Sequence, residues 1–328
     1  EEREGTPQPE VMDRIRKKLD KQYPGWLLDE TSLITANDST FIKVEVVMDG
    51  VEHNLYYTTE GKKYDPRGLM DSDGWSTKDL AASMPADEPY NVLRPDSSWA
   101  LPALLREVSG IAMAGPHSVY CVQDELGAVF EYDLQTDAII RVMRFTDVGD
   151  FEGVAAHGDR ITVLRSDGKL FTLDRKSGAL IGDRQLSVPS LYYEGLFALP
   201  DGSLLLASKE APVVGHGDLR PIHLVKGDAV SVYRELNTSD VSATFAKQWP
   251  ALAKGAVRFS PSAVAVHPRT GQLFVLSADE RLLAIYGDSL ERVIPLPAAD
   301  FYKPEGLAFL PNGDLLISSE GDKKGLVP

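Results

Sequence analysis

Three glutamates stand at the same place in a repeated phrase, each directly before a glycine. They are Glu152, Glu194 and Glu305. A Glu that recurs at one position of a repeat predicts that these side chains line a channel shared by the repeats, because isolated turns more naturally use Asp, Asn or Ser. Carboxylate oxygens suit a hard cation such as Ca²⁺, and Mg²⁺ less well. The structural alternative is a hydrogen bond from each carboxylate to a backbone N–H of a neighbouring repeat.

A second set of charged residues follows 14 to 16 positions after the small residue of each phrase. It comprises Asp124, Asp167, Glu210, Asp279 and Glu320, with Lys209 beside Glu210. If each phrase opens a hairpin, the end of the returning strand lies on the same face as its start. We therefore predict an outer ligand-binding rim formed by Asp124, Lys209, Glu210, Asp279 and Glu320. Lys209 could pair with Glu194 or Glu210, or contact an anionic ligand. Asp167 precedes a glycine and is more typical of a turn.

So many like charges cannot all stay ionised close together without compensation. Either some of the carboxyl groups are protonated, or a cation lies among them. The sequence therefore predicts a Ca²⁺ site formed by Glu152, Glu194 and Glu305.

The phrase itself predicts the architecture. It reads apolar, Glu or Ser, small, aliphatic and usually Ala, and it begins at Val108, Phe151, Tyr193, Pro261 and Pro304. Its second residue stands at positions 109, 152, 194, 262 and 305, so the intervals are 43, 42, 68 and 43 residues. A period of roughly 40–45 residues made of short strands is typical of a β-propeller blade. We expect a mainly β fold with a propeller of five or six blades.

Each phrase should open the innermost strand of a blade, followed by a second apolar strand. These second strands are predicted at 119–122, 161–164, 203–207, 273–276 and 314–317. The long third interval predicts an insertion over 211–260, with strands near 222–225 and 230–235 and a helix over 243–252. The last blade is too short for four strands, and a propeller must close to hide its edges. We expect the strand at Trp99–Leu105 to supply its outermost strand.

The first 66 residues have a different pattern. From Pro9 apolar residues recur every four positions, which predicts a helix that ends at Pro24-Gly25. Strands are expected over 26–35, 40–48 and 51–59, with a tight turn at Asp49-Gly50. The predicted organisation is a helix-plus-sheet domain over 9–66, a linker or covering loop over 67–96 with a short helix at 77–84, and the propeller over 97–328.

Composition excludes some functions. The chain has 328 residues and a net charge of −15, which argues against nucleic acid or anionic lipid as a partner. No apolar run is long enough to span a membrane. The single cysteine, Cys121, allows no internal disulfide, and the six histidines lack zinc-site spacing. His216 could overhang the central channel of the predicted propeller. The chain starts at Glu1 without Met, which predicts that an upstream segment has been removed.

From Ser98 onward the chain resembles the SdiA-regulated β-propeller family. The resemblance rests on the opening Ser109-Gly110-Ile111-Ala112, the three Glu-Gly pairs, Ser208-Lys209-Glu210 and the closing Ile317-Ser318-Ser319-Glu320. More remotely the chain is similar to calcium-dependent propeller lactonases and phytase-like esterases. In the lactonases a Glu-Gly-Pro glutamate binds the metal, whereas here Val or Leu follows Glu-Gly.

Residues 9–61 resemble the PepSY-like modules of secreted bacterial proteins, through the helix, Tyr23-Pro24-Gly25 and the strand pair around Asp49-Gly50. Together the two resemblances imply a periplasmic protein or an outer-membrane lipoprotein.

Three functions remain open at this point. The first is a non-catalytic protein of the cell envelope, expected to be a monomer. The mouth of its propeller channel would bind Ca²⁺ and contact a small ligand or an envelope protein. The second is a metal-dependent hydrolase of the lactonase or phytase/esterase type. The third is a structural scaffold whose acids are merely solvated.

Overall fold

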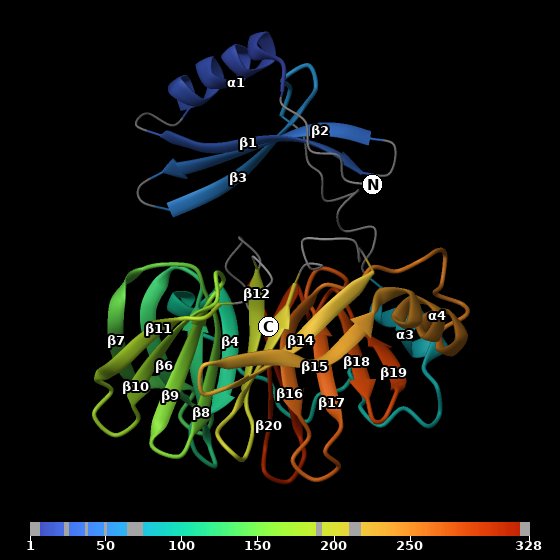
Figure 1. Ribbon diagram of the computed structural model, residues 1–328. Coiled ribbons are helices and arrows are strands. Elements are labelled where there is room, and N and C mark those ends of the chain that lie inside the picture. Colours follow the sequence, from blue (N-terminus) through green and yellow to red (C-terminus); the bar gives the residue numbers. More distant parts are fainter. Residues whose placement is uncertain are drawn as a thin grey trace. The chain divides into compact units, whose positions relative to one another are not determined.

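The computed structural model describes residues 7–22, 26–36, 39–48, 51–63, 75–187, 192–209 and 218–321. The chain forms two compact units, Glu1–Asp73 and Gly74–Pro328. In Figure 1 the first unit is blue and the second runs from cyan to red. None of the helices in the described ranges is long and apolar enough to cross a membrane.

The first unit packs one helix on a three-stranded antiparallel sheet. Its elements are α1 (Pro9–Gln22), β1 (Leu27–Ala36), β2 (Ser39–Met48) and β3 (Val51–Thr58), with sheet order β1-β2-β3. Ile15 and Leu19 of the apolar helix stripe are fully buried against the sheet, where Val44 of β2 is also fully buried. The predicted helix and strands are therefore confirmed. The predicted helix stop at 23–25 and turn at 49–50 lie outside the described residues.

The second unit has a propeller-like arrangement of antiparallel sheets (Figure 1). Four sheets have four strands each: β4 (Val108–Met113), β5 (Ser118–Gln123), β6 (Leu126–Asp133) and β7 (Ala138–Val148); β8 (Phe151–His157), β9 (Arg160–Arg165), β10 (Lys169–Asp174) and β11 (Leu180–Gln185); β12 (Tyr193–Ala198), β13 (Leu204–Ser208), β14 (Leu219–Lys226) and β15 (Ala229–Asn237); and β16 (Pro261–Val266), β17 (Leu273–Ser277), β18 (Leu282–Tyr286) and β19 (Leu290–Pro295). A fifth sheet has two strands, β20 (Lys303–Phe309) and β21 (Leu315–Glu320). Each predicted phrase lies at the start of a first strand, and each predicted second strand is present.

The first strands of the five sheets contact one another in a closed order, β4–β8–β12–β16–β20–β4. The small residue of the phrase makes this approach possible. A Cβ atom at Gly153 would lie 2.7 Å from the Cβ of Leu196 and 3.0 Å from the carbonyl oxygen of Glu194. A Cβ at Gly195 would lie 3.0 Å from the backbone nitrogen of Val264. Close packing between neighbouring inner strands therefore explains the third position of the phrase.

Each phrase also contains a β-bulge. The register of the first strand against the second shifts across the second phrase residue in all five sheets, for example between Phe151 and Gly153 and between Tyr193 and Gly195. A bulge bends the strand and redirects its extra side chain. The second position of the phrase is therefore a structurally equivalent point in every sheet.

The strands predicted near 222–225 and 230–235 are present as β14 and β15, but their assignment to an insertion is wrong. β14 and β15 are the third and fourth strands of the same sheet as β12 and β13. The additional length comes from α4 (Thr238–Gln248) and the segment up to Pro261. The helix begins five residues before the predicted position because Asn237 caps it, accepting a hydrogen bond from the backbone N–H of Ser239 at 2.9 Å.

The prediction of a strand at Trp99–Leu105 is also wrong. Residues 99–102 form no strand, and Ala103–Leu105 form a 3₁₀ helix. Pro102 lacks the N–H that a sheet ladder needs, which disfavours a strand here. In the described chain no further strand pairs with β21.

Side chains make the closing contacts instead. On the outermost strands β7, β11 and β15 an arginine donates to a backbone carbonyl in the last turn of the following sheet: Arg141 to Arg175 at 2.9 Å, Arg184 to Gly227 at 2.6 Å and Arg234 to Gly287 at 2.9 Å. The two-stranded sheet has no such turn within the described residues. Arg292 of β19 therefore donates to the carbonyl oxygen of Asp87 at 3.2 Å and pairs with its carboxylate.

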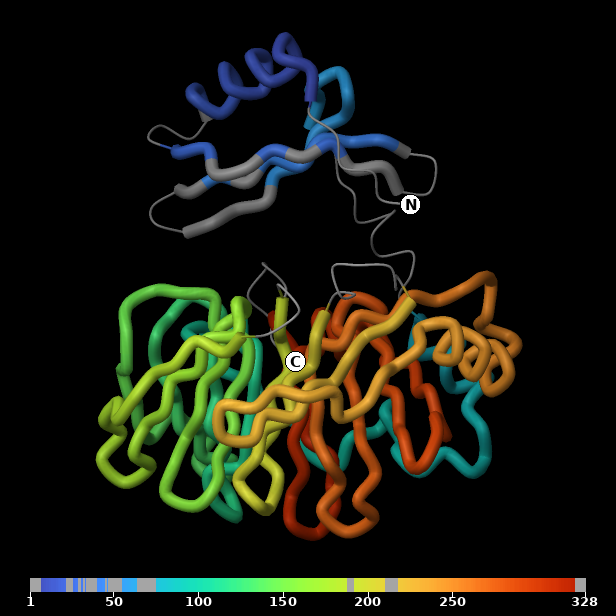
Figure 2. The backbone as a smooth tube through the Cα atoms, in the orientation of Figure 1, coloured from blue at the N-terminus to red at the C-terminus, as the bar shows by residue number. Residues whose placement is uncertain are grey.

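We call residues 75–102 the closing strap; it is the cyan-to-teal segment of Figure 2. The strap contains α3 (Thr77–Ser83), within the helix predicted at 77–84. Tyr90 packs edge-on against Phe274 with ring centroids 5.6 Å apart. At its far end Trp99 Nε1 donates to the carbonyl of Leu134, in the turn between β6 and β7, at 2.7 Å. The strap thus provides the contacts that an outer turn of the fifth sheet would make.

Replacing Gly153 by alanine should destabilise the second unit. The added methyl group would overlap Leu196, so the inner strands must separate, and we expect a loss of about 1–3 kcal/mol in the free energy of unfolding. Gly182→Ala in β11 is the matched control, because nothing lies within 4 Å of the position that its Cβ would take. Urea unfolding of both variants measures the difference. Equal stability of the two variants would show that the inner strands are not closely packed.

Removing the Arg292 side chain should weaken the closure. Glu88 of the strap has a side chain only 3% exposed, and burial raises its pKa to about 7 against the opposing effect of Arg292. Arg292→Ala leaves this carboxyl without its cation, so we expect a loss of about 1–3 kcal/mol at pH 8. The exposed Arg160→Ala should change stability by less than about 0.5 kcal/mol. Protease cleavage within the strap, followed over time, should be faster in Arg292→Ala, and an unchanged rate would contradict the closing role.

Candidate functional site

The second residue of the phrase, which lies at the bulge, is a serine in two sheets and a glutamate in three, and the two residue types have different roles. In the first and fourth sheets it is a buried serine. Ser109 Oγ donates to the carbonyl of Phe151 in the next inner strand at 2.6 Å, and Ser262 Oγ lies 3.5 Å from the carbonyl of Pro304. These serines connect neighbouring sheets. In the other three sheets the same position carries Glu152, Glu194 or Glu305, whose carboxyl groups are brought to the start of the inner strands.

Glu305 is held by a lysine that the repeat pattern does not predict. Lys303 Nζ lies 2.7 Å from Glu305 Oε1 and 2.7 Å from Glu320 Oε1. Glu305 is buried, and burial raises its pKa well above the usual range, although Lys303 opposes this shift. Lys303 stands two residues before Glu305, at the start of the same strand. That spacing is the signal in the sequence from which the pair could be found.

Glu194 is held by Lys209, one of the two pairings considered from the sequence. Lys209 Nζ lies 2.6 Å from Glu194 Oε1 and 3.9 Å from Asp279 Oδ2. Burial raises the pKa of Glu194 and Lys209 opposes this. The second carboxylate oxygen, Oε2, is buried and has no hydrogen-bond partner among the described residues. A buried acceptor without a donor costs free energy, so this oxygen marks an incomplete site.

Glu152 makes no hydrogen bond and no ion pair within the described part of the chain. Burial, together with the neighbouring carboxylates of Glu194 and Asp150, raises its pKa to about 9, while Lys209 and Lys303 act in the opposite direction. This shift favours the neutral carboxyl group unless a cation lies close to it.

The predicted rim residues separate into two groups. Burial raises the pKa of Asp124 to about 7, with Glu107 and Glu320 adding to the effect, so Asp124 and Glu320 belong to the same electrostatic cluster. Asp279 is exposed and reaches only the edge of the cluster near Lys209. Glu210 and His216 lie outside the described residues.

Asp167 is a turn residue, as its glycine neighbour suggested. Its carboxylate pairs with Arg165 at 2.7 Å and accepts the backbone N–H of Lys169 at 3.1 Å. The position after β9 that matches Lys209 is taken by Ser166.

We call the connected groups the mouth cluster: Asp124, Glu152, Glu194, Lys209, Asp279, Lys303, Glu305 and Glu320. It holds six carboxyl groups and two ammonium groups. A positive charge would complement this cluster, because it would favour the ionised form of carboxyl groups that burial keeps neutral. Within the described ranges no three His, Cys, Asp or Glu side chains are arranged to hold a metal ion. Two of the three glutamates expected to bind Ca²⁺, Glu194 and Glu305, form ion pairs with Lys209 and Lys303.

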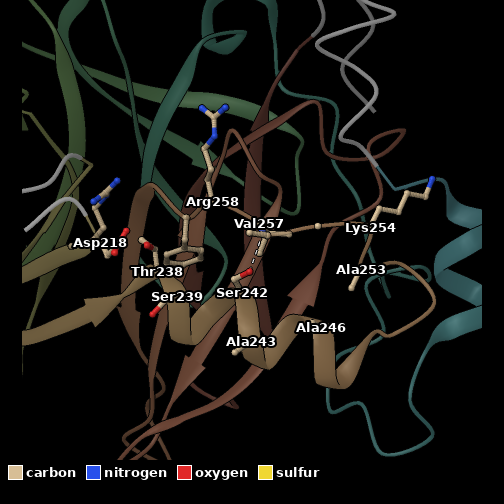
Figure 3. A pocket seen from close by; sticks show the side chains of 14 residues that line it. Asp218, Thr238, Ser239, Ser242, Ala243, Ala246, Ala253, Lys254, Val257 and Arg258 are labelled. Atoms are coloured by element: carbon tan, nitrogen blue, oxygen red, sulfur yellow. Dashed lines mark hydrogen bonds between the residues drawn. The ribbon is translucent and has the colours of Figure 1, made fainter. Parts of the chain in front are cut away.

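A cavity of about 780 Å³ lies away from the mouth cluster, beside α4. Figure 3 shows Thr238, Ser239 and Ser242 of the helix along one side of it. Two of its polar groups form hydrogen bonds within the fold: Ser242 Oγ accepts the N–H of Val257 at 3.1 Å, and Asp218 accepts the N–H of Thr238 through its carbonyl at 2.9 Å. Charged residues also line the cavity, namely Asp218, Arg220, Lys254 and Arg258.

Comparison with known proteins assigns neither a family nor a function to the chain. No family model and no curated protein matches the sequence. A chain of a nidogen/laminin complex is similar over 65% of this chain and 72% of its own length, with 14% identity and a TM-score of 0.44. A protein of unknown function from Bacteroides caccae is similar over 62% of this chain and 65% of its own length, with 16% identity and a TM-score of 0.38. Both TM-scores lie below 0.5, so no statement about fold or function rests on these two structures.

Stability should depend on the ionisation of Glu152. Its pKa is raised from 4.5 to about 9 by folding, so the folded state holds a proton that the unfolded state releases. Stability is then lost as pH rises through this window. We expect Glu152→Gln to be more stable than the wild type at pH 8 by on the order of 2 kcal/mol, with little difference at pH 4.5. Urea unfolding at both pH values, with exposed Asp159→Asn as the control, measures it. A difference that does not change with pH would rule out a buried neutral Glu152.

Proposed function

We propose that this protein is a non-catalytic binding protein whose mouth cluster takes a cationic ligand. The observation that carries the proposal is the uneven pairing of buried charges. Two of the phrase glutamates hold a lysine, Glu152 holds none within the described residues, and Glu194 has a buried oxygen without a donor. A bound cation would satisfy both groups together.

The family of the chain is part of the proposal. The resemblance of residues 98–328 to the SdiA-regulated propellers and of residues 9–61 to PepSY-like modules supports a cell-envelope protein. We propose that the two-stranded sheet and the closing strap together count as the fifth blade. The closed order of the five inner strands supports this number.

Calcium is the first cation to test, since the available ligands are carboxylate oxygens. The ammonium groups of Lys209 and Lys303 repel a divalent ion more strongly than a monovalent one, which favours a monovalent cation at the same place. Other cations that could replace the proton of Glu152 are therefore candidates for the same site.

The experiment is a thermal unfolding series on EDTA-treated protein with added Ca²⁺, Mg²⁺, Na⁺ or alkylammonium salts. A ligand that binds only the folded state raises the melting temperature, and 100 times its Kd is equivalent to about 2.7 kcal/mol. We expect at least one cation to raise the melting temperature of the wild type and to lose this effect in Glu152→Gln. Asp159→Asn removes one exposed carboxylate and should behave as the wild type. If no cation gives a shift that depends on Glu152, the proposed function is wrong and the scaffold interpretation replaces it.

A metal-dependent hydrolase is the alternative, because strongly raised carboxyl pKa values also occur at catalytic sites. In that case a bound metal would polarise a carbonyl or phosphoryl group and a carboxylate would act as the base. Turnover of generic lactones or phosphate esters that requires metal and is lost in Glu152→Gln would favour catalysis over binding.

A further inference from the structure

The three phrase glutamates can be compared directly, because the repeat places them at equivalent positions. Lys209 Nζ lies 2.6 Å from Glu194 and Lys303 Nζ lies 2.7 Å from Glu305. Both distances are typical of charge-assisted N–H···O hydrogen bonds or slightly shorter. Two of the three positions are thus occupied by a primary ammonium group supplied by the chain itself.

The third position lacks this group for a reason visible in the sequence. Lys303 stands two residues before its glutamate, and Lys209 directly follows the second strand of its sheet. In the second sheet the corresponding residues are Asp150 and Ser166. Neither can supply a cation, so the carboxyl of Glu152 has no internal partner within the described part of the chain.

A second, independent observation comes from the neighbouring sheet. Glu194 is 8% exposed, and its Oε2 atom is buried without a hydrogen-bond donor among the described residues even though Oε1 is bound to Lys209. Glu194 also lies on the neighbouring inner strand, where a Cβ at Gly153, the residue after Glu152, would lie 3.0 Å from the Glu194 carbonyl oxygen. The two glutamates therefore present carboxyl oxygens that lack donors within one cluster.

We infer that Glu152, together with Oε2 of Glu194, binds the primary ammonium group of a small alkylamine. This inference rests on the proposed function and specifies its ligand class. A primary ammonium carries three N–H donors, enough for both glutamates. Its single charge is repelled by Lys209 and Lys303 half as strongly as that of a divalent metal at the same place.

The proton balance of binding is simple. Any proton on the Glu152 carboxyl leaves to solvent when the ammonium ion binds, and a carboxylate–ammonium pair remains. Burial and the neighbouring carboxylates raise the pKa of Glu152, so affinity should rise with pH as long as the alkylamine stays protonated.

The test is ligand-observed NMR titration of the full chain with butylammonium chloride at pH 6, 7 and 8. Tetramethylammonium is the ligand control, since it has the same charge and no N–H donor, and we expect it to bind at least about tenfold more weakly. Glu152→Gln should reduce butylammonium affinity at least about tenfold and lessen its pH dependence, while Asp124, whose pKa is raised to about 7, still titrates in the mouth cluster. Glu152→Ser, which installs the residue found at this position in the first and fourth sheets, gives a second variant that the fold already accommodates. Asp159→Asn should bind as the wild type.

The outcomes separate this inference from the proposed function. If Ca²⁺ or another metal stabilises the protein through Glu152 and butylammonium does not bind, the ligand class is wrong and the cation-binding function stands. If butylammonium binds equally to the wild type, Glu152→Gln and Glu152→Ser, the site assignment is overturned. If no cation binds, both the inference and the proposed function fail.

Discussion

The close approach of the inner strands is the constraint on which the rest of the second unit depends. Neighbouring first strands pack so tightly that a single Cβ at Gly153 would overlap the next strand. A small residue is therefore required at the third phrase position, and the bulge that precedes it redirects the second residue in each sheet. Where that residue is serine it bonds to the neighbouring strand, and where it is glutamate the same geometry places a carboxyl group among others.

This packing has an electrostatic consequence. Carboxyl groups gathered in a partly dry environment favour their neutral form unless cations are close. Lys209 and Lys303 compensate Glu194 and Glu305, but they arise from different elements, one after β13 and one at the start of β20. Among the described residues no equivalent lysine serves Glu152. The incomplete compensation is a property of the sequence differences between repeats, and it is this asymmetry that makes one position available to a ligand.

The propeller-like fold, the inner strands and the candidate residues Glu152, Glu194 and Asp124 could be predicted from the sequence, because the phrase repeats at a nearly constant interval. The bulge could not, since register depends on pairing with the second strand. The charge compensation by Lys303 does not follow from the repeat either, because Lys303 precedes the phrase in one sheet only. The strand expected at Trp99–Leu105 failed because closure does not need a ladder, and Pro102 disfavours one.

Closure by side chains gives the ring a different kind of stability from closure by a strand. A sheet ladder distributes its hydrogen bonds along the backbone, whereas the strap depends on a few contacts, notably Arg292 with Asp87 and Trp99 with Leu134. The outer arginines of the other sheets show that this contact belongs to a general scheme, in which each sheet holds the last turn of the next. The strap follows that scheme without a strand. The strap begins at Trp75, immediately after the boundary between the two units in the sequence. The segment that closes the second unit is therefore the one that directly follows the first unit along the chain.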